Sequence, residues 1–229
     1  MNSPLFGITL SIASYLIFIK IQKKTKINLL NPLLLSGLFI ILLLSIFNID
    51  YEAYNEGGKV ITMLITPATV SLALPLYKNL ELIKKNMKLV LTSVLFGIII
   101  HAIVIIILTL ILKPNIDIVK SLIPKSITTA IAIDLTDSLG GIKEITVASV
   151  LITGIIGAAI SPLINQVLKV DNDKSIGLAL GASAHAVGTA KAASTNLVQG
   201  SFSSIALILT GLFTVVLAPI ILSVILLLV

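Results

Sequence analysis

The sequence predicts an all-α, polytopic integral membrane protein that forms a single domain over residues 1–229. Hydrophobic residues make up 57% of the chain and charged residues only 11%, and the mean hydropathy is +1.13. Soluble domains carry about 25% charged residues, so this chain has too few of them to cover a surface that faces water. Apolar runs long enough to cross a bilayer recur from one end of the chain to the other. The solvent of this protein is therefore lipid.

About seven or eight helical segments follow from these runs. The apolar segments cover residues 4–21, 29–47, 58–76, 89–112, 119–135, 145–168, 176–197 and 202–229. The first could be mistaken for a cleaved signal peptide, but its lysines, from Lys20 to Lys26, follow the apolar run and do not precede it. We therefore expect a retained first helix.

The distribution of charge predicts the orientation in the membrane. The loop after the first segment is rich in lysine, and so is the loop after the third, with Lys78, Lys84, Lys85 and Lys88. An excess of lysine marks the cytoplasmic side, so we expect these two loops to face the cytoplasm. Eight full crossings would then place both termini outside. A re-entrant segment would reverse the side of everything that follows it.

The segments are of two kinds. The second, fourth, sixth and eighth are rich in Leu, Ile and Val, as scaffold helices are, whereas the third, fifth and seventh are rich in small and polar residues and are interrupted. A sparse internal repeat accompanies this alternation: Pro67, Ala73, Gly97 and Ala102 have the same spacing as Pro124, Ala130, Gly154 and Ala159, and Thr153, Gly154 and Pro162 match Thr210, Gly211 and Pro219. Such matches also arise by chance in membrane helices. If real, they indicate internal inverted repeats of the secondary-transporter type, in which interrupted helices meet near the midplane.

The interruptions supply the candidate substrate-binding residues. In the third segment these are Pro67, Ala68 and Thr69; the break is either a tolerated proline kink or a half-helix start that can hold an anion. In the fifth segment Lys125, Ser126, Thr128 and Thr129 follow Pro124. Lys125 is either a lysine that extends to the membrane surface from a helix end or the cation of a carboxylate site. Asp134, deeper in that segment, is costly unless it is paired or hydrated.

The seventh segment is the most informative of the three. Its glycines and alanines allow close helix packing, but packing does not explain His185, Thr189 and Lys191, which together with Gly188 complete the candidate set. Ionisable groups inside membranes usually face a pathway or a partner; a structural hydrogen bond to a neighbouring helix is the alternative. His101 is alone in an apolar segment, and we interpret it as a helix–helix hydrogen bond.

Several functions are not expected from this sequence. Cysteine is absent, which excludes disulfides and thiolate sites, and two histidines without an acidic cluster make a weak metal site. Ser183 and His185 are two positions apart and point to different helix faces. We therefore expect no enzyme, no catalytic residues, no metal and no other cofactor.

The three interrupted segments resemble the LrgB/CidB family of bacterial membrane proteins. The resemblance is carried by Pro-Ala-Thr-Val-Ser-Leu-Ala-Leu-Pro-Leu-Tyr at 67–77, Pro-Lys-Ser-Ile-Thr-Thr at 124–129 and His-Ala-Val-Gly-Thr-Ala-Lys-Ala at 185–192, and it covers essentially the whole chain. The chain departs from the usual family residues at Ala130, Asp134, Lys191 and Gln199, and the last of these puts ion coupling at that position in doubt.

The resemblance implies two competing functions in the bacterial cell (inner) membrane. The first is a carrier for a small monocarboxylate such as pyruvate, glycolate, glycerate or lactate; the plant plastidal relative exchanges glycolate and glycerate. The second is a holin- or antiholin-like regulator of murein hydrolase activity and cell lysis that acts with a small LrgA/CidA-type membrane protein. The expected partners are thus the bilayer, a small carboxylate, that small protein and further copies of the chain, with no nucleic acid.

Overall fold

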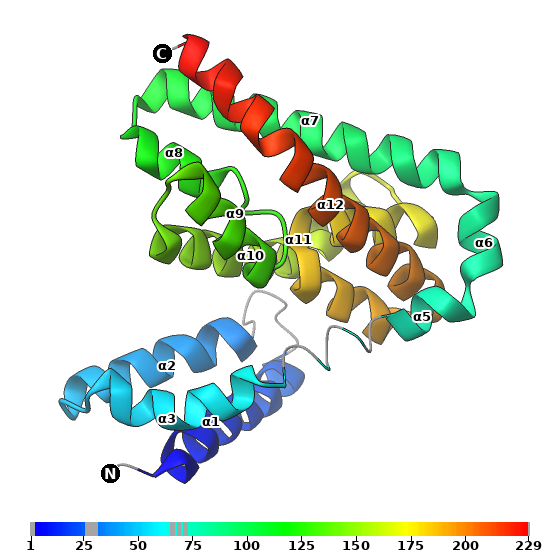
Figure 1. The fold of residues 1–229 in the computed structure, drawn as a ribbon. Helices are drawn as coiled ribbons and strands as arrows, with labels where there is room; N and C mark the ends of the chain where they lie inside the picture. The colour runs from blue at the N-terminus through cyan, green and yellow to red at the C-terminus, as the bar shows by residue number, and fades with distance from the viewer. Residues whose placement is uncertain (1–2, 26–31, 65–66, 68–69, 71–72, 229) are drawn as a thin grey trace. The chain divides into compact units, whose positions relative to one another are not determined.

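The computed structural model describes residues 1–229 except for 1–2, 26–31, 65–66, 68–69, 71–72 and 229 (Figure 1). In the described residues every regular element is a helix, as expected for a polytopic membrane protein. The chain divides into two compact units, Met1–Ser71 and Leu72–Val229. Each unit is described by itself.

The described residues of the first unit form three helices. These are α1 (Pro4–Thr25), α2 (Pro32–Ile46) and α3 (Tyr51–Thr62), and α1 contacts both of the others. Gly7 and Gly57 lie where α1 crosses α3, and a Cβ atom on either would collide with the backbone of the other helix. The Ser11 and Tyr54 hydroxyls hydrogen-bond at 2.8 Å one turn further along. Small residues therefore set the close approach of these two helices.

The second unit is built around three long helices. Its helices are α5 (Ala73–Lys78), α6 (Leu80–Lys85), α7 (Met87–Leu112), α8 (Ile116–Leu122), α9 (Thr129–Leu139), α10 (Lys143–Val167), α11 (Asp173–Thr195) and α12 (Leu197–Leu228). In the described chain, α1, α7, α10 and α12 are long and apolar enough to cross a membrane. The last three correspond to the predicted fourth, sixth and eighth segments.

The predicted fifth segment is a helical hairpin, formed by α8, a turn at 123–128 and α9, which we call the first hairpin. The Lys120 side chain hydrogen-bonds the Gly140 carbonyl, and the backbone N–H of Ile142 donates to Ser121 Oγ at 2.7 Å. Thr146 Oγ1 then joins the two arms, since it bonds both the Ser121 carbonyl and Thr136 Oγ1. The end of α9 thus returns to the level of α8, and the segment enters and leaves at the same end of the unit.

The predicted seventh segment is also a hairpin, formed by α11, which we call the second hairpin. Ala184 and His185 have non-helical backbone angles, with φ of 41° at His185, so α11 consists of arms 173–183 and 186–195. A Cβ atom on Gly188 would collide with the Leu180 carbonyl, although residues eight apart in a straight helix are separated by about 12 Å. Gln199, just past the second arm, donates to Asp173 at the start of the first arm at 2.7 Å. Both ends of α11 therefore lie together.

The directions of the long helices follow from the way the two hairpins fold back. Each hairpin returns the chain to the end where it began, so α10 runs antiparallel to α7, and α12 runs antiparallel to α10. Figure 1 shows α7 and α12 side by side and running in the same direction, and these helices contact one another. The two hairpins accordingly enter the unit from opposite ends.

The hairpins are spaced as the predicted repeat requires. Their first arms begin at residues 116 and 173, and their second arms at 129 and 186, a shift of 57 in both cases. Asn115 and Asn172 cap the first arms in the same way, each accepting a backbone N–H two residues later. The antiparallel arrangement of α7 and α10 makes the second copy inverted, in agreement with the fold class predicted from sequence.

Candidate functional site

The tips of the two hairpins lie against the middle of the long helices. His101 of α7 hydrogen-bonds the Ile123 carbonyl in the first tip at 2.9 Å, and His185 in the second tip bonds the Val150 carbonyl of α10 at 2.9 Å. His101 lies eleven residues before the end of α7, or about 16 Å at 1.5 Å per residue. That is about half of a hydrocarbon core of roughly 30 Å, so the first tip lies at mid-depth along α7. Val150 is seven residues after the start of α10, so the second tip reaches past the middle of that helix.

A cavity of about 880 Å³ opens beside the first tip. Its walls come from α7, the 123–128 turn, α10, the first arm of α11 and α12. Lys125 and Ser126 line it from the first tip. Asn165 lines it near the C-terminal end of α10, and Ser175 near the start of α11. The cavity therefore extends from the midplane toward the end of the unit where the second hairpin begins.

Lys125 is the only charged residue that lines this cavity among the described residues. Its side chain is partly buried, and within the described part of the chain its ammonium group forms no hydrogen bond or ion pair. The other polar groups in the wall are hydroxyls, an amide and one imidazole. A cation surrounded by neutral groups makes the cavity attractive to anions and unattractive to cations.

The start of α9 adds to this positive character. Thr128 is its N-cap residue, but its hydroxyl does not cap the helix. The first N–H groups of α9, beginning at Thr129, therefore have no side-chain cap in the same tip that carries Lys125. A helix N-terminus bears a partial positive charge. Of the four residues predicted in this segment, Lys125 and Ser126 line the cavity, and Thr128 and Thr129 form the adjoining helix start.

His185, Gly188 and Thr189 are packed against neighbouring helices instead. His185 is 3% exposed, and its ring lies against Gly154, where a Cβ atom would come within 2.5 Å of it. Thr189 donates to the His185 carbonyl at 2.9 Å and accepts from Ser203 of α12 at 3.0 Å. These residues are not in the cavity wall. In this structure they hold the bend of α11 and fix it to α10 and α12.

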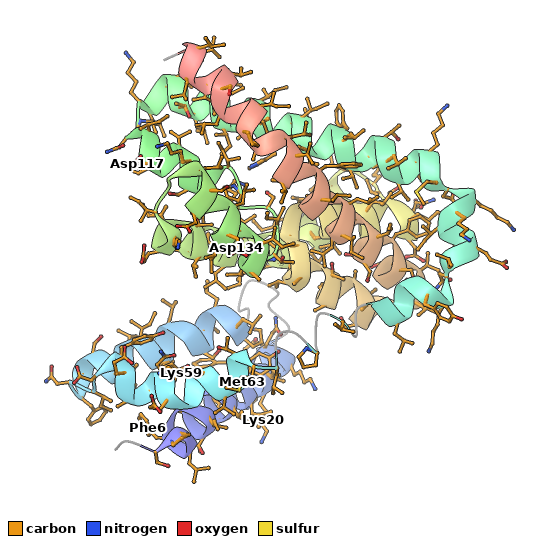
Figure 2. All side chains as sticks on the ribbon, viewed as in Figure 1. Phe6, Lys20, Lys59, Met63, Asp117 and Asp134 are labelled. Atoms are coloured by element: carbon orange, nitrogen blue, oxygen red, sulfur yellow. The ribbon has the colours of Figure 1, made fainter. Side chains whose placement is uncertain are left out.

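The remaining predicted residues lie elsewhere. Lys191 is exposed on the second arm of α11 and does not line the cavity. Asp134 is exposed on α9 (Figure 2). Pro67 is exposed and belongs to the first unit, while Ala68 and Thr69 lie outside the described residues.

Sequence reasoning missed part of the cavity wall. The hydrogen bond predicted for His101 is confirmed, but His101 also lines the cavity beside Lys125. Thr153 of α10 and Thr210 of α12 line it as well. The predicted repeat could have found both threonines, because it pairs them. Within the described residues, no group of three or more His, Asp or Glu side chains is arranged to hold a metal ion.

Comparisons with known proteins place the chain in a family. Residues 11–224 match the model of the LrgB-like family. The chain is 35% identical over 216 residues to the holin-like protein CidB of Staphylococcus aureus strain Mu50, with 94% of each chain covered. It is 36% identical over 219 residues to the antiholin-like protein LrgB of Bacillus subtilis, with 95% of each covered. No solved structure matches. The chain belongs to the LrgB-like family of multi-pass bacterial membrane proteins.

Proposed function

We propose that the protein binds a small organic anion at Lys125 and carries it across the cell membrane. The observation that supports this most is the ammonium group itself, which lies in a midplane cavity without a carboxylate in the described wall. A charge inside a membrane is costly unless it is paired or hydrated. A bound anion would provide the partner.

A small monocarboxylate fits this chemistry. One carboxylate balances one ammonium group, and the hydroxyls in the wall can bond its oxygens. The cavity of about 880 Å³ is much larger than a three-carbon acid, which is consistent with an access route as well as a binding site. Pyruvate, glycolate, glycerate and lactate are the ligands to test.

The two opposed hairpins give this site a means of alternating access. Inverted repeats allow a carrier to adopt two related arrangements, each open to one side. The lysine-rich α5–α6 region precedes α7 and lies at the end toward which the cavity extends. Since excess lysine marks the cytoplasmic side, we infer that this conformation opens to the cytoplasm.

A holin- or antiholin-like role in controlling murein hydrolase activity and lysis is the second candidate. The names of the relatives, holin-like CidB and antiholin-like LrgB, favour it over the carrier, and none of them mentions a carboxylate. In this case the protein would act with a small LrgA/CidA-type partner and through further copies of itself. A lesion-forming role does not by itself require a cation in the wall of a cavity that has no carboxylate among its described residues, which is why the geometry favours the carrier.

Proteoliposomes distinguish the two candidates. We expect saturable uptake of radiolabelled pyruvate, glycolate or lactate into vesicles that retain an encapsulated fluorescent dye. Uptake should be measured with and without a proton gradient, because the comparison shows whether transport is coupled to protons. If none of the three acids enters, even with the small partner present, the carrier proposal is wrong. Dye release from the same vesicles would support the holin-like role.

A further inference from the structure

A threonine of α12 also lines the cavity. Thr210 is 2% exposed and lines the cavity. Its Oγ1 is the one buried side-chain oxygen or nitrogen of the described residues that has no hydrogen-bond partner. A buried polar group without a partner costs about 1–3 kcal/mol, so such a group in a native structure calls for an explanation.

Its neighbours on the same helix show that this is not a general property of α12. Ser201, Ser204 and Ser223 each donate to the carbonyl one turn earlier. This local bond is available to serine and threonine in any helix, yet Thr210 does not make it. Its hydroxyl thus has no partner among the described residues, although the residue lines the cavity.

Thr210 also lies close to the tip that carries Lys125. A Cβ atom on the adjacent Gly211 would be 3.4 Å from the side chain of Ile131, the third residue of α9. The start of α9 adjoins the 123–128 turn, so α12 brings Thr210 to the positive end of the first hairpin. Thr210 and Lys125 thus line the same cavity, from α12 and from the first tip.

A matching threonine comes from α10. Thr153 is 57 residues before Thr210 and lines the same cavity, and its hydroxyl forms no hydrogen bond with the described residues. The repeat extends to the next turn, since Gly157 and Thr214 also line the cavity. Repeat-related positions of two antiparallel helices thus present hydroxyls to one space.

We propose that Thr210, assisted by Thr153, hydrogen-bonds the anion held by Lys125 and acts as a specificity-determining residue. This inference rests on the proposed function. The ammonium group supplies charge attraction with little directionality, whereas a hydroxyl at a fixed position on a rigid helix selects ligands by the placement of their oxygens. Removing such a bond to a charged ligand weakens binding about tenfold or more.

The test compares pyruvate binding to purified full-length variants by isothermal titration calorimetry. Thr210→Val keeps the shape and removes the hydroxyl, and Thr210→Ser keeps the hydroxyl. The matched control is Thr109→Val, because Thr109 is equally buried but bonds the Ile105 carbonyl of α7 outside the cavity. We expect Thr210→Val to raise the Kd about tenfold or more, Thr153→Val to raise it less, and Thr210→Ser and Thr109→Val to leave it within about threefold.

The outcomes separate this inference from the proposed function. If the wild-type protein binds pyruvate and Thr210→Val binds it equally well, Thr210 has no such role while the carrier proposal stands. If the wild type binds neither pyruvate, glycolate nor lactate, the proposed function itself fails. Thermal unfolding of each variant shows whether it is folded. If Thr210→Val and Thr210→Ser both lose pyruvate binding and both unfold at a lower temperature than the wild type, the result would contradict a ligand contact by the hydroxyl.

Discussion

Lys125 and Lys191 show how differently two lysines can be placed in one membrane protein. Both follow a break in a helical segment, and both were predicted to attract a carboxylate. Lys125 lies in the wall of the midplane cavity, whereas Lys191 is exposed on the second arm of α11. At the residue scale the structure therefore separates two positions that sequence reasoning treated as equivalent.

Substitution of the two lysines tests this difference directly. Lys125→Ala should abolish carboxylate uptake in proteoliposomes, because it removes the charge opposite the anion. Lys125→Arg should keep part of the activity, since it retains the charge but changes the geometry. If the cavity is the site, Lys191→Ala should retain most of the wild-type uptake. Loss in Lys191→Ala with normal uptake in Lys125→Ala would move the site to α11.

At the scale of elements, glycines govern how closely the second hairpin packs. Gly177 and Gly181 of α11 contact the α12 backbone, and a Cβ atom on Gly181 would collide with the Ser203 carbonyl. The small residues of this segment were predicted to serve packing. The structure adds that α12 packs against both arms of α11, because Gly200 of α12 also contacts Ala193 of the second arm.

A pair of Gly→Ala changes should therefore differ in their effect on stability. Gly181→Ala should lower the Tm, since a collision with a rigid backbone costs about 1–3 kcal/mol. Gly37→Ala in α2 should raise the Tm slightly or leave it unchanged, because no atom lies within 4 Å of the added methyl group and alanine favours the helix by about 1 kcal/mol. Circular dichroism at 222 nm in detergent measures both. Equal Tm values would show that the close approach of α11 and α12 is not tight.

The hairpins also change the expected topology. Two re-entrant segments place the loops at 113–115 and 140–142 on one side of the membrane, and the ends of the second hairpin, at 168–172 and 196, on the other. Eight full crossings would place the loop at 140–142 on the cytoplasmic side and the loop at 169–172 outside. The C-terminus lies on the same side of the membrane in both arrangements, so only the loops at 140–142 and 169–172 distinguish re-entrant hairpins from full crossings.

Single-cysteine labelling can test this topology without further engineering, because the chain has no cysteine of its own. Ser138, Asp171 and Lys84 are all exposed. In spheroplasts, a membrane-impermeant maleimide should label Ser138→Cys and should not label Asp171→Cys or Lys84→Cys until the membrane is permeabilised. Labelling of Asp171→Cys from outside and protection of Ser138→Cys would instead indicate full crossings.

At the scale of the whole molecule, sequence patterns predicted the class of fold and the segments that are broken. The predicted breaks at Pro124 and near His185 are confirmed as the two hairpin tips. Hydropathy could not show that these segments fold back, because it reports the length of an apolar run and not its direction. It also could not identify Thr210, since the face of α12 that lines a cavity depends on how the helices pack.

The central claim is that the protein is a carrier with one anion site exposed alternately to the two sides. Counterflow measures this most directly: vesicles preloaded with unlabelled pyruvate are diluted into a trace of labelled pyruvate. A carrier predicts a transient accumulation of label above its equilibrium level, abolished by Lys125→Ala. A monotonic approach to equilibrium, the same in wild type and Lys125→Ala and accompanied by dye release, would contradict the claim and indicate a pore.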